Sequence, residues 1–302
     1  MPVKTLIVIA GPTAVGKTAL SIAIAKELRA PIVSADSRQF FKELSIGTAK
    51  PSKEEMQGVP HYMIDSHSIT EEYNVGKYES EVIPLLDDLF RENDQVILTG
   101  GSGLYIDAVC KGLDELPEAD PGTRNKIAEI LAAEGIEGLQ KLLEKLDPEY
   151  YGKVDLNNPQ RLSRALEVCI SSGKAYSSLR KGSRKKRNFE IVKIGLNMDR
   201  AELYRRIDRR VDEMMKAGLL NEVRSLYENR AANALQTVGY KDLFDHIDGK
   251  SDLSSAIDQI KQNTRNFAKR QLTWFRRDGE IKWFEPGEKE NILAYIQQRI
   301  RV

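Results

Sequence analysis

Short apolar runs alternate with helix-like segments over the first hundred residues of the chain. Continuous apolar stretches predict strands buried on both faces at residues 6–10, 31–35, 62–64 and 95–99. Apolar residues spaced three and four apart predict helices at residues 17–29 and 75–92. Strands that lack polar alternation and are separated by helices are typical of βαβ units. We therefore expect an α/β fold with a parallel sheet.

The pattern changes at residues 116–122, where two prolines and a glycine indicate a linker. Residues 123–173 show helical periodicity and no strand, whereas residues 189–196 alternate as a strand would. After Asp199, apolar residues at helical spacing among many charged ones predict a long charged helix. Further elements are expected at residues 253–276 (helix), 280–284 (edge strand) and 289–300 (helix). The simplest arrangement is an α/β core of residues 1–117 and 189–302 with an all-helical insertion at residues 118–188.

Composition narrows the class of protein. The 302 residues include 46 Lys and Arg against 45 Asp and Glu, so a polyanionic partner must be met by local basic patches. No apolar run approaches the roughly 18 residues that span a bilayer, which argues against membrane insertion. Cys110 and Cys169 form no Cys-x-x-Cys pair and the three His residues are scattered, which excludes disulfide scaffolds and structural zinc sites. We expect a cytoplasmic protein.

Residues 11–18 match the phosphate-binding pattern G-x-x-x-x-G-K-[ST] at every fixed position. A predicted strand precedes this loop and a predicted helix follows it, as the motif requires. The glycines let backbone N–H groups converge on a phosphate at a helix N-terminus. Lys17 would neutralise a terminal phosphate, and the Thr18 hydroxyl would hold Mg²⁺. The alternative is a glycine-rich turn that only caps a helix. The motif indicates a diphosphate or triphosphate but names no reaction.

The carboxylate best placed beside this loop is Asp36. A P-loop NTPase usually has an Asp at the end of an apolar strand to help hold magnesium, but strand 95–99 is followed by a glycine-rich turn that contains Ser102. Asp36 follows strand 31–35, and such strand ends open at the sheet edge where ligands bind. Asp36 could hold a metal, act as a general base, or only cap a turn. Asp65 is the next candidate.

Several segments in order make the chain resemble the tRNA dimethylallyltransferases, also called tRNA isopentenyltransferases. They are GPTAVGKT at 11–18, DSRQ at 36–39, IGTAKP at 46–51, GGSGLY at 100–105, NPQRLSRALE at 158–167, VGYK at 238–241 and AKRQLTWFR at 268–276. The phosphate-binding loop is shared by many enzymes. The segments that begin at Ile46, Gln160 and Ala268 are far more specific, and the resemblance runs nearly end to end.

This resemblance implies a P-loop NTPase-like core with an inserted helical domain, and a reaction. The family transfers a dimethylallyl group from dimethylallyl diphosphate to the exocyclic amine of the tRNA adenine on the 3′ side of the anticodon, giving N6-dimethylallyladenosine. By resemblance, Asp36 is the general base, and Lys17, Thr18 and Ser102 complete the catalytic set. Mg²⁺ is the implied cofactor, with Thr18 as its ligand. We expect a monomer that binds the tRNA anticodon stem-loop and no membrane.

The resemblance also implies two sets of binding residues. Diphosphate-binding residues would be Gly11, Pro12, Thr13, Ala14, Val15, Gly16, Lys17 and Thr18. Residues that contact tRNA would be Asp36, Ser37, Arg38, Gln39, Ser102, Arg124, Gln160, Arg161, Leu162, Ser163, Arg164, Lys269, Arg270, Gln271, Trp274 and Arg276.

Departures from the family pattern are modest. The family usually has Thr where Ser102 stands, so a hydroxyl is kept. It usually continues the Asp36 motif with Val-Tyr, whereas this chain has Phe40-Phe41 and lacks the tyrosine hydroxyl. The C-terminal zinc-finger extension of eukaryotic members is missing, so the chain resembles the bacterial form.

The implied chemistry suits these residues. An adenine amine is a poor nucleophile because its lone pair is delocalised into the ring, so transfer needs a good leaving group and a nearby base. Loop amides, Lys17 and Mg²⁺ would meet the negative charge that grows on the departing diphosphate. A base in a stacked anticodon loop is unreachable, so we expect the target adenine to be extruded.

Some basic segments have two readings. Residues 261–277 carry six basic residues and no acidic one, with Phe267, Trp274 and Phe275 interleaved, which suits RNA contact or a helix whose aromatics face the core. Residues 180–187, with six basic residues in eight, form a solvated loop or follow phosphates. Arg161 and Arg164 clamp RNA or only pair with Glu167.

Rival functions explain part of the sequence. A P-loop kinase of a nucleoside or small metabolite explains residues 11–18, Asp36 and a helical insertion, but not residues 160–164 or 269–276. An adenylate isopentenyltransferase would share the core but act on free nucleotides. A nucleotide-dependent RNA-binding module without chemistry is the alternative outside the enzymes.

Overall fold

The computed structural model describes residues 3–117, 120–182 and 184–300, and the chain divides into two compact units. The core unit consists of Met1–Cys110 and Lys186–Val302, and the insertion unit consists of Lys111–Lys185. The first and last residues of the insertion unit are hydrogen-bonded to each other: the Lys185 N–H donates to the Lys111 carbonyl at 2.8 Å. The boundary expected at residue 118 from the prolines and the glycine lies several residues after the start of this unit at Lys111.

A six-stranded sheet, parallel at every pairing, forms the centre of the core unit. Its order is β3-β2-β4-β1-β5-β6. The strands are β1 (Thr5–Ala10), β2 (Ile32–Ser34), β3 (His61–Tyr62), β4 (Gln95–Gly100), β5 (Glu190–Leu196) and β6 (Lys282–Phe284). β1 pairs with β4 on one side and with β5 on the other, so its carboxyl end lies at the middle of the sheet.

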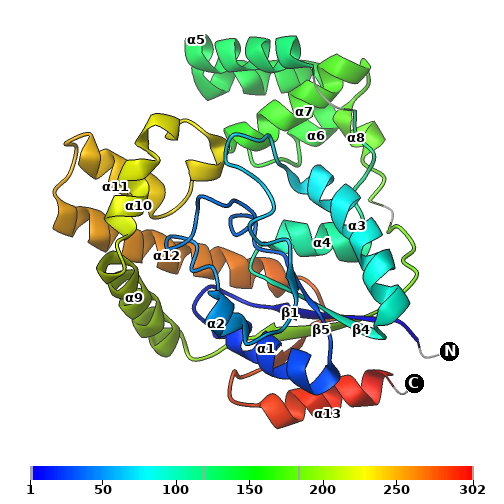
Figure 1. The fold of residues 1–302 in the computed structure, drawn as a ribbon. Helices are drawn as coiled ribbons and strands as arrows, with labels where there is room; N and C mark the ends of the chain where they lie inside the picture. The colour runs from blue at the N-terminus through cyan, green and yellow to red at the C-terminus, as the bar shows by residue number, and fades with distance from the viewer. Residues whose placement is uncertain (1–2, 118–119, 183, 301–302) are drawn as a thin grey trace. The chain divides into compact units, whose positions relative to one another are not determined.

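Helices cover both faces of this sheet (Figure 1). Those that begin in the core unit are α1 (Lys17–Leu28), α2 (Lys53–Met56), α3 (Val75–Glu92), α4 (Gly103–Lys111), α9 (Arg200–Lys216), α10 (Leu219–Ser225), α11 (Tyr240–Ile247), α12 (Leu253–Phe275) and α13 (Lys289–Ile300). The 3-10 turns η1 (Tyr227–Asn229) and η2 (Asn233–Leu235) lie between α10 and α11. Figure 1 shows α1 and α13 below the sheet and α3, α4 and α12 above it.

Successive residues of β1 enter two different hydrophobic cores. Leu6 and Val8 belong to the cluster that includes residues of α3, α4 and α12, whereas Ile7 and Ile9 belong to the cluster that includes residues of α1 and α13. Every residue of β1 is buried. A strand buried on both faces has no polar positions, which is why β1 reads as one continuous apolar run.

The described residues of the insertion unit form helices joined by short loops, with no strand. Its helices are α5 (Pro121–Leu146), α6 (Pro148–Tyr151), α7 (Pro159–Ser172) and α8 (Tyr176–Leu179), and α5 is interrupted at Gly135, where φ is 69° and ψ is −164°. Leu139, Leu143 and Leu162 form its core with neighbouring apolar residues. Asp147 accepts hydrogen bonds from the N–H of Tyr150 and from Ser177. Burial alone would raise the pKa of Asp147, but these bonds hold it below its usual value.

The predicted α/β fold with a parallel sheet is confirmed. Most strands lie within a residue or two of their expected limits, and residues 280–284 contain the edge strand β6. The strand expected at residues 62–64 ends earlier, at Tyr62, because Met63 and Asp65 have φ of 59° and 52°, in the left-handed region that an extended strand excludes. None of the described helices is long and apolar enough to cross a membrane.

Candidate active site

The phosphate-binding loop joins the end of β1 to α1. Gly11 has φ of 152°, and a Cβ there would lie 2.7 Å from the Leu196 carbonyl oxygen, so no larger residue fits. Gly16 has φ of 105° and forms the N-cap of α1 without a side-chain hydrogen bond. The N–H groups of the first turn are therefore directed toward whatever binds above the loop. Val15 packs its side chain into the core, so only its backbone serves the loop.

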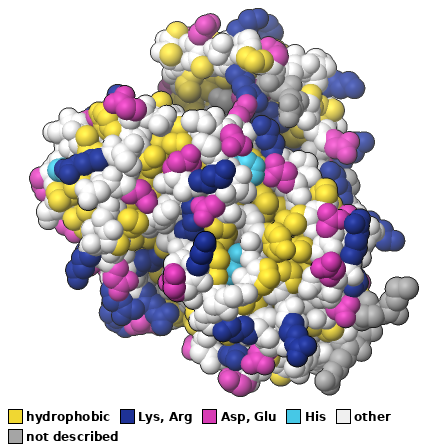
Figure 2. Space-filling view, viewed as in Figure 1, with side chains coloured by type: hydrophobic (Ala, Val, Ile, Leu, Met, Phe, Trp, Pro, Cys, Tyr) yellow, Lys and Arg dark blue, Asp and Glu magenta, His cyan; other side chains and the backbone are white. Residues whose placement is uncertain are grey.

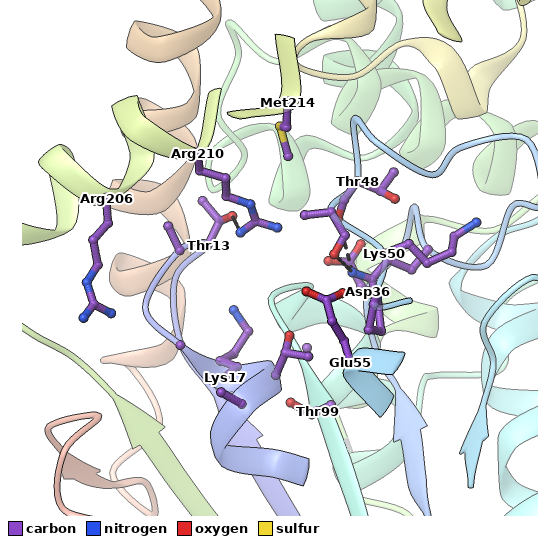
Figure 3. A pocket seen from close by; sticks show the side chains of 18 of the residues that line it. Thr13, Lys17, Asp36, Thr48, Lys50, Glu55, Thr99, Arg206, Arg210 and Met214 are labelled. Atoms are coloured by element: carbon purple, nitrogen blue, oxygen red, sulfur yellow. Dashed lines mark hydrogen bonds between the residues drawn. The ribbon is translucent and has the colours of Figure 1, made fainter. Parts of the chain in front are cut away.

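A cavity of ≈ 880 Å³ opens above this loop (Figure 3). It is bounded by residues of the phosphate-binding loop, the segment after β2, the end of β4, and helices α1, α2, α9 and α12. Figure 3 shows Lys17, Asp36, Glu55 and Arg210 directed toward its interior from different elements. Thr18, the second residue of α1, is exposed and also lines the cavity. The expected loop and its expected aspartate therefore share one cavity.

Lys17 is folded back over its own loop. Its ammonium donates to the carbonyls of Gly11 at 3.0 Å and Pro12 at 2.8 Å. Burial lowers the pKa of Lys17 from its usual value to about 8, with Asp36 opposing this shift and Arg210 adding to it. The ammonium is thus held ready for an anion, in an environment that would stabilise it further once a negative charge entered.

Arg210 is a second cation at the same cavity, and the sequence reading missed it. It projects from α9, and its guanidinium donates to the Thr13 hydroxyl at 3.2 Å. Burial lowers its pKa, and the nearby Asp36 and Glu55 carboxylates oppose that effect. Arg206, one turn earlier on α9, lines the cavity as well. Two arginines four residues apart on one charged helix were the available signal for this site.

Asp36 forms a turn and also lies at the cavity, so turn formation does not exclude the metal-binding and general-base roles that the sequence left open. Its carboxylate accepts the Arg38 N–H at 3.0 Å, which is an Asx turn, and its own N–H donates to Ser34 Oγ at 3.3 Å. It also lines the cavity and raises the pKa of Lys17. The turn therefore fixes a carboxylate in the cavity opposite the lysine.

Ser102 and Ser37 lie against each other beside Asp36. The Ser37 N–H donates to Ser102 Oγ at 3.0 Å, and the two hydroxyl oxygens are also 3.0 Å apart. The hydroxyl at position 102 thus connects the turn after β4 to the Asp36 turn after β2.

Arg38 and Gln39 take different directions. The Arg38 guanidinium donates to the Asn233 carbonyl at 3.1 Å. Burial lowers the pKa of Arg38, and the nearby Tyr105 and Asp36 oppose this shift. Gln39 lines the cavity, and its amide donates to the carbonyls of Thr48 and Ala49 at 3.2 and 3.3 Å. Asp65, the second carboxylate candidate, does not line the cavity and instead pairs with Lys50.

Glu222 on α10 holds the segment 45–47 at the cavity wall, and no motif marks it. Its carboxylate accepts the N–H groups of Ser45 at 3.1 Å, Ile46 at 2.7 Å and Gly47 at 3.0 Å. It also accepts the Tyr240 hydroxyl at 2.6 Å. Burial and this carboxylate raise the pKa of Tyr240 well above its usual value. Through Glu222, these bonds connect the IGTAKP segment to Tyr240 of the VGYK segment.

Helix α12 presents two faces. Lys269, Arg270 and Arg276 are exposed, as an RNA-facing surface requires, and the Arg270 guanidinium lies 5.8 Å from the centre of the Phe267 ring. Gln271 is only 6% exposed and points inward, so its side chain does not belong to that surface. Trp274 is half-buried and donates its indole N–H to Asp107 Oδ2 at 2.9 Å. The interleaved aromatics thus divide, with Phe275 in the core and Phe267 at the cavity.

The RNA candidates of the insertion unit also divide. Gln160 and Arg161 are exposed at the start of α7, while Arg124 and Ser163 are partly exposed. Arg164 donates to Glu167 at 3.2 Å, the pairing that the sequence left as an alternative. Leu162 is completely buried in the unit's core, so its side chain cannot contact RNA.

Within the described part of the basic octapeptide, Arg187 has a structural role. Arg187 does not follow phosphates, since its guanidinium donates to the carbonyls of Val109 at 2.8 Å and Ala108 at 2.7 Å and to Glu79 at 2.9 Å. Residue 183 of the octapeptide lies outside the described residues. On the face seen in Figure 2, basic side chains are interspersed with acidic ones, in keeping with the net charge of +1.

The oxygen donors at the cavity suit a divalent cation that is shared with a bound phosphate. Over residues 3–117, 120–182 and 184–300, no group of three or more His, Cys, Asp or Glu side chains is placed to hold a metal. Mg²⁺ at phosphate sites commonly takes one or two protein ligands and completes its shell with phosphate oxygens and water. Thr18 and Asp36 both line the cavity and supply donors of this kind.

Comparisons with known proteins agree along the whole chain. The family model described as IPP transferase matches residues 39–278. The chain is 50% identical over 301 residues to tRNA dimethylallyltransferase 1 of Bacteroides fragilis, covering 100% of both chains. It is 52% identical to the tRNA dimethylallyltransferase of Flavobacterium johnsoniae, covering 99% of both.

Solved structures give the same result. The tRNA isopentenylpyrophosphate transferase of Bacillus halodurans superposes with a TM-score of 0.73 at 36% identity, covering 99% of this chain and 97% of that one. A eukaryotic dimethylallyltransferase, solved as it acts on tRNA, superposes with a TM-score of 0.80 at 28% identity, covering 98% of this chain and 77% of that one.

Proposed function

The chain belongs to the tRNA dimethylallyltransferase family, and from this premise we propose that it transfers a dimethylallyl group to a tRNA adenine. The donor is dimethylallyl diphosphate, and the acceptor is the exocyclic amine of the adenine on the 3′ side of the anticodon. The observation that carries the proposal is one cavity that contains both a phosphate-binding loop and a fixed carboxylate. The relatives' full-length similarity supplies the substrate class.

The donor diphosphate would bind over the phosphate-binding loop. Backbone N–H groups at the start of α1 and the cations Lys17 and Arg210 surround the place where its charge would lie. As the carbon–oxygen bond of the donor breaks, the electron pair and its charge pass to the diphosphate. Groups that are already oriented toward that charge stabilise the transition state without reorganising.

Mg²⁺ would be bound jointly by the Thr18 hydroxyl and the diphosphate. When bound, it would supply additional positive charge to the leaving group. Proton acceptance and tRNA binding would be carried out by the protein's own residues.

Asp36 would accept the proton that the amine loses as its nitrogen forms the new bond to carbon. Its Asx turn fixes one carboxylate oxygen on the Arg38 N–H, which holds the group in a single orientation. Ser102, through its contact with Ser37, would keep the turn after β4 next to this base. Proton transfer by a positioned side chain contributes about 10²- to 10⁴-fold to a rate.

The tRNA would be bound by exposed residues of both units. In the insertion unit these are Gln160 and Arg161, with the partly exposed Arg124 and Ser163, and at α12 and its C-cap they are Lys269, Arg270 and Arg276. Gln39 in the cavity wall would contact the extruded adenine.

The test is product formation from defined substrates. Purified protein, Mg²⁺, dimethylallyl diphosphate and unmodified tRNA should yield prenylated adenosine, detected by mass spectrometry of nucleosides. The Asp36→Ala variant should lose the product but still bind tRNA, which separates an enzyme from an RNA-binding module. Product from free adenylate alone, or from ATP and a small acceptor with the tRNA unchanged, would refute the proposal.

A further inference from the structure

Gln271 lies between the two loops that the proposed reaction must align. Its Oε1 accepts the Thr13 N–H at 2.8 Å, and its Nε2 donates to the Gly101 carbonyl at 2.9 Å. We propose that Gln271 is a positioning residue that fixes the donor loop relative to the acceptor loop, rather than a contact to tRNA. This proposal rests on the function proposed above.

The two partners require a carboxamide. Thr13 offers an N–H and Gly101 offers a carbonyl, so the bridging side chain must accept at one end and donate at the other. The carboxamide of Gln271 carries both groups on one planar unit. A carboxylate at this position would direct a second acceptor at the Gly101 carbonyl, and a shorter or apolar side chain would leave buried polar groups unpaired.

The fit against Gly101 is close. A Cβ at position 101 would lie 2.3 Å from Gln271 Nε2, and the next atoms are Gln271 Cδ at 3.4 Å and the Gly11 carbonyl oxygen at 3.8 Å. Gly101 does not have a left-handed φ. A Cβ at position 101 would therefore displace the terminal amide of Gln271, while the backbone conformation of Gly101 itself sets no such limit.

One helical turn later, α12 repeats the arrangement. Trp274 occupies the space above Gly103, where a Cβ would lie 2.3 Å from the indole ring, and its N–H donates to Asp107. Residues three apart on a helix lie on the same face. Gln271 and Trp274 thus dock α12 on the turn that contains Ser102, and only Gln271 also reaches the phosphate-binding loop.

The two residues bonded to Gln271 lead to the dimethylallyl-donor side and to the adenine-acceptor side of the proposed site. On the donor side, the Thr13 hydroxyl receives Arg210, so Thr13 joins Gln271 to the second cation of the cavity. On the acceptor side, Gly101 precedes Ser102, which contacts Ser37 next to Asp36. Reacting groups that are misplaced by about 1 Å can lose about 10²-fold in rate. Loss of the bridge should therefore slow the transfer itself.

The first experiment compares Gln271→Ala and Gln271→Glu with the wild type. The matched control is Gln259→Ala, an exposed glutamine on the same helix. We expect both Gln271 variants to lose about tenfold or more in kcat at saturating substrates, since Gln271→Ala removes both hydrogen bonds and Gln271→Glu replaces the donor to the Gly101 carbonyl by an acceptor. The KM for dimethylallyl diphosphate should rise, while the Kd for tRNA, measured by filter binding without donor, should stay within about twofold of wild type. Gln259→Ala should match the wild type.

The outcomes are separable. A raised tRNA Kd with unchanged kcat would make Gln271 a tRNA contact and overturn the proposal. A lowered melting temperature with unchanged kcat per folded enzyme would make it structural only, which also overturns it. A wild type that forms no prenylated adenosine would refute the proposed function instead.

A double-mutant cycle adds a second criterion. Gly101→Ala alone should impair kcat as severely as Gln271→Ala, because the new Cβ collides with Nε2. The combined variant should be no worse than Gln271→Ala, since the truncated side chain leaves room for the methyl group. Independent, multiplying losses would contradict the bridge.

Discussion

Raising the pH through 8 should progressively weaken donor binding, because the Lys17 ammonium is the cation nearest to losing its proton. Burial lowers its pKa to about 8, so the free protein holds it protonated below that pH and neutral above it. A bound diphosphate stabilises the protonated form. The observed affinity should therefore be constant below pH 8 and should fall above it.

The expected slope follows from the protonated fraction. One pH unit above the pKa, about a tenth of the protein still carries the ammonium, and each further unit reduces that fraction about tenfold. At pH 9 the affinity for inorganic diphosphate should thus be about a tenth of its value well below pH 8, a difference equivalent to about 1.4 kcal/mol. The fall ends at the higher pKa that Lys17 has in the complex.

Titration calorimetry with inorganic diphosphate between pH 6.5 and 9.5 would measure this directly. Asp36 raises the pKa of Lys17 and Arg210 lowers it, so Asp36→Asn should move the midpoint to lower pH and Arg210→Gln to higher pH. Lys17→Arg keeps its charge throughout, so its profile records only the ionisation of the diphosphate, and the wild-type affinity should fall relative to it. An unchanged wild-type affinity up to pH 9.5, or an equal fall in Lys17→Arg, would refute the assignment.

Two further predictions concern the supports of the site. Glu222→Gln turns an amide donor toward backbone N–H groups of residues 45–47. We therefore expect the free energy of unfolding, measured with urea, to fall by about 1–3 kcal/mol. A loss below about 0.5 kcal/mol would show that these bonds contribute little to stability. Gly103→Ala places a Cβ 2.3 Å from the Trp274 ring. It should cost about 1–3 kcal/mol by the same measurement, and Trp274→Ala in the same chain should relieve part of that cost, whereas purely additive losses would contradict the contact.

The sequence was informative wherever local pattern dictates structure. Continuous apolar runs identified the sheet strands because burial on both faces removes polar positions, as in β1. The loop before Lys17 was recognisable since its glycines and its cation stand at fixed spacing. The position of Asp36 followed from the rule that parallel strands end at one edge, and the structure places it in the cavity beside that loop.

The rest depended on contacts between distant segments. Arg210 read as one of many charges on a helix, and only the packing of α9 brings its guanidinium to Thr13. Glu222 carried no motif, since its partners are backbone N–H groups, which have no sequence signature. Gln271 stood within a basic segment, and the segment's composition could not tell which residues of the helix face inward. For the same reason, the sequence could not show that the Leu162 side chain, which was expected to contact tRNA, is buried inside the insertion unit.

The position of β5 has a consequence for biosynthesis. β5 flanks the central strand, and its last residue closes over Gly11, yet it is translated only after the whole insertion unit. Gln271 emerges from the ribosome later still. A nascent chain that stops before these segments contains the entire glycine-rich motif but lacks one of the two strands that flank β1 and the Leu196 carbonyl that lies against Gly11. Competence for donor binding should therefore arise late in translation, and the slow pairing of remote segments should limit how quickly newly made protein matures.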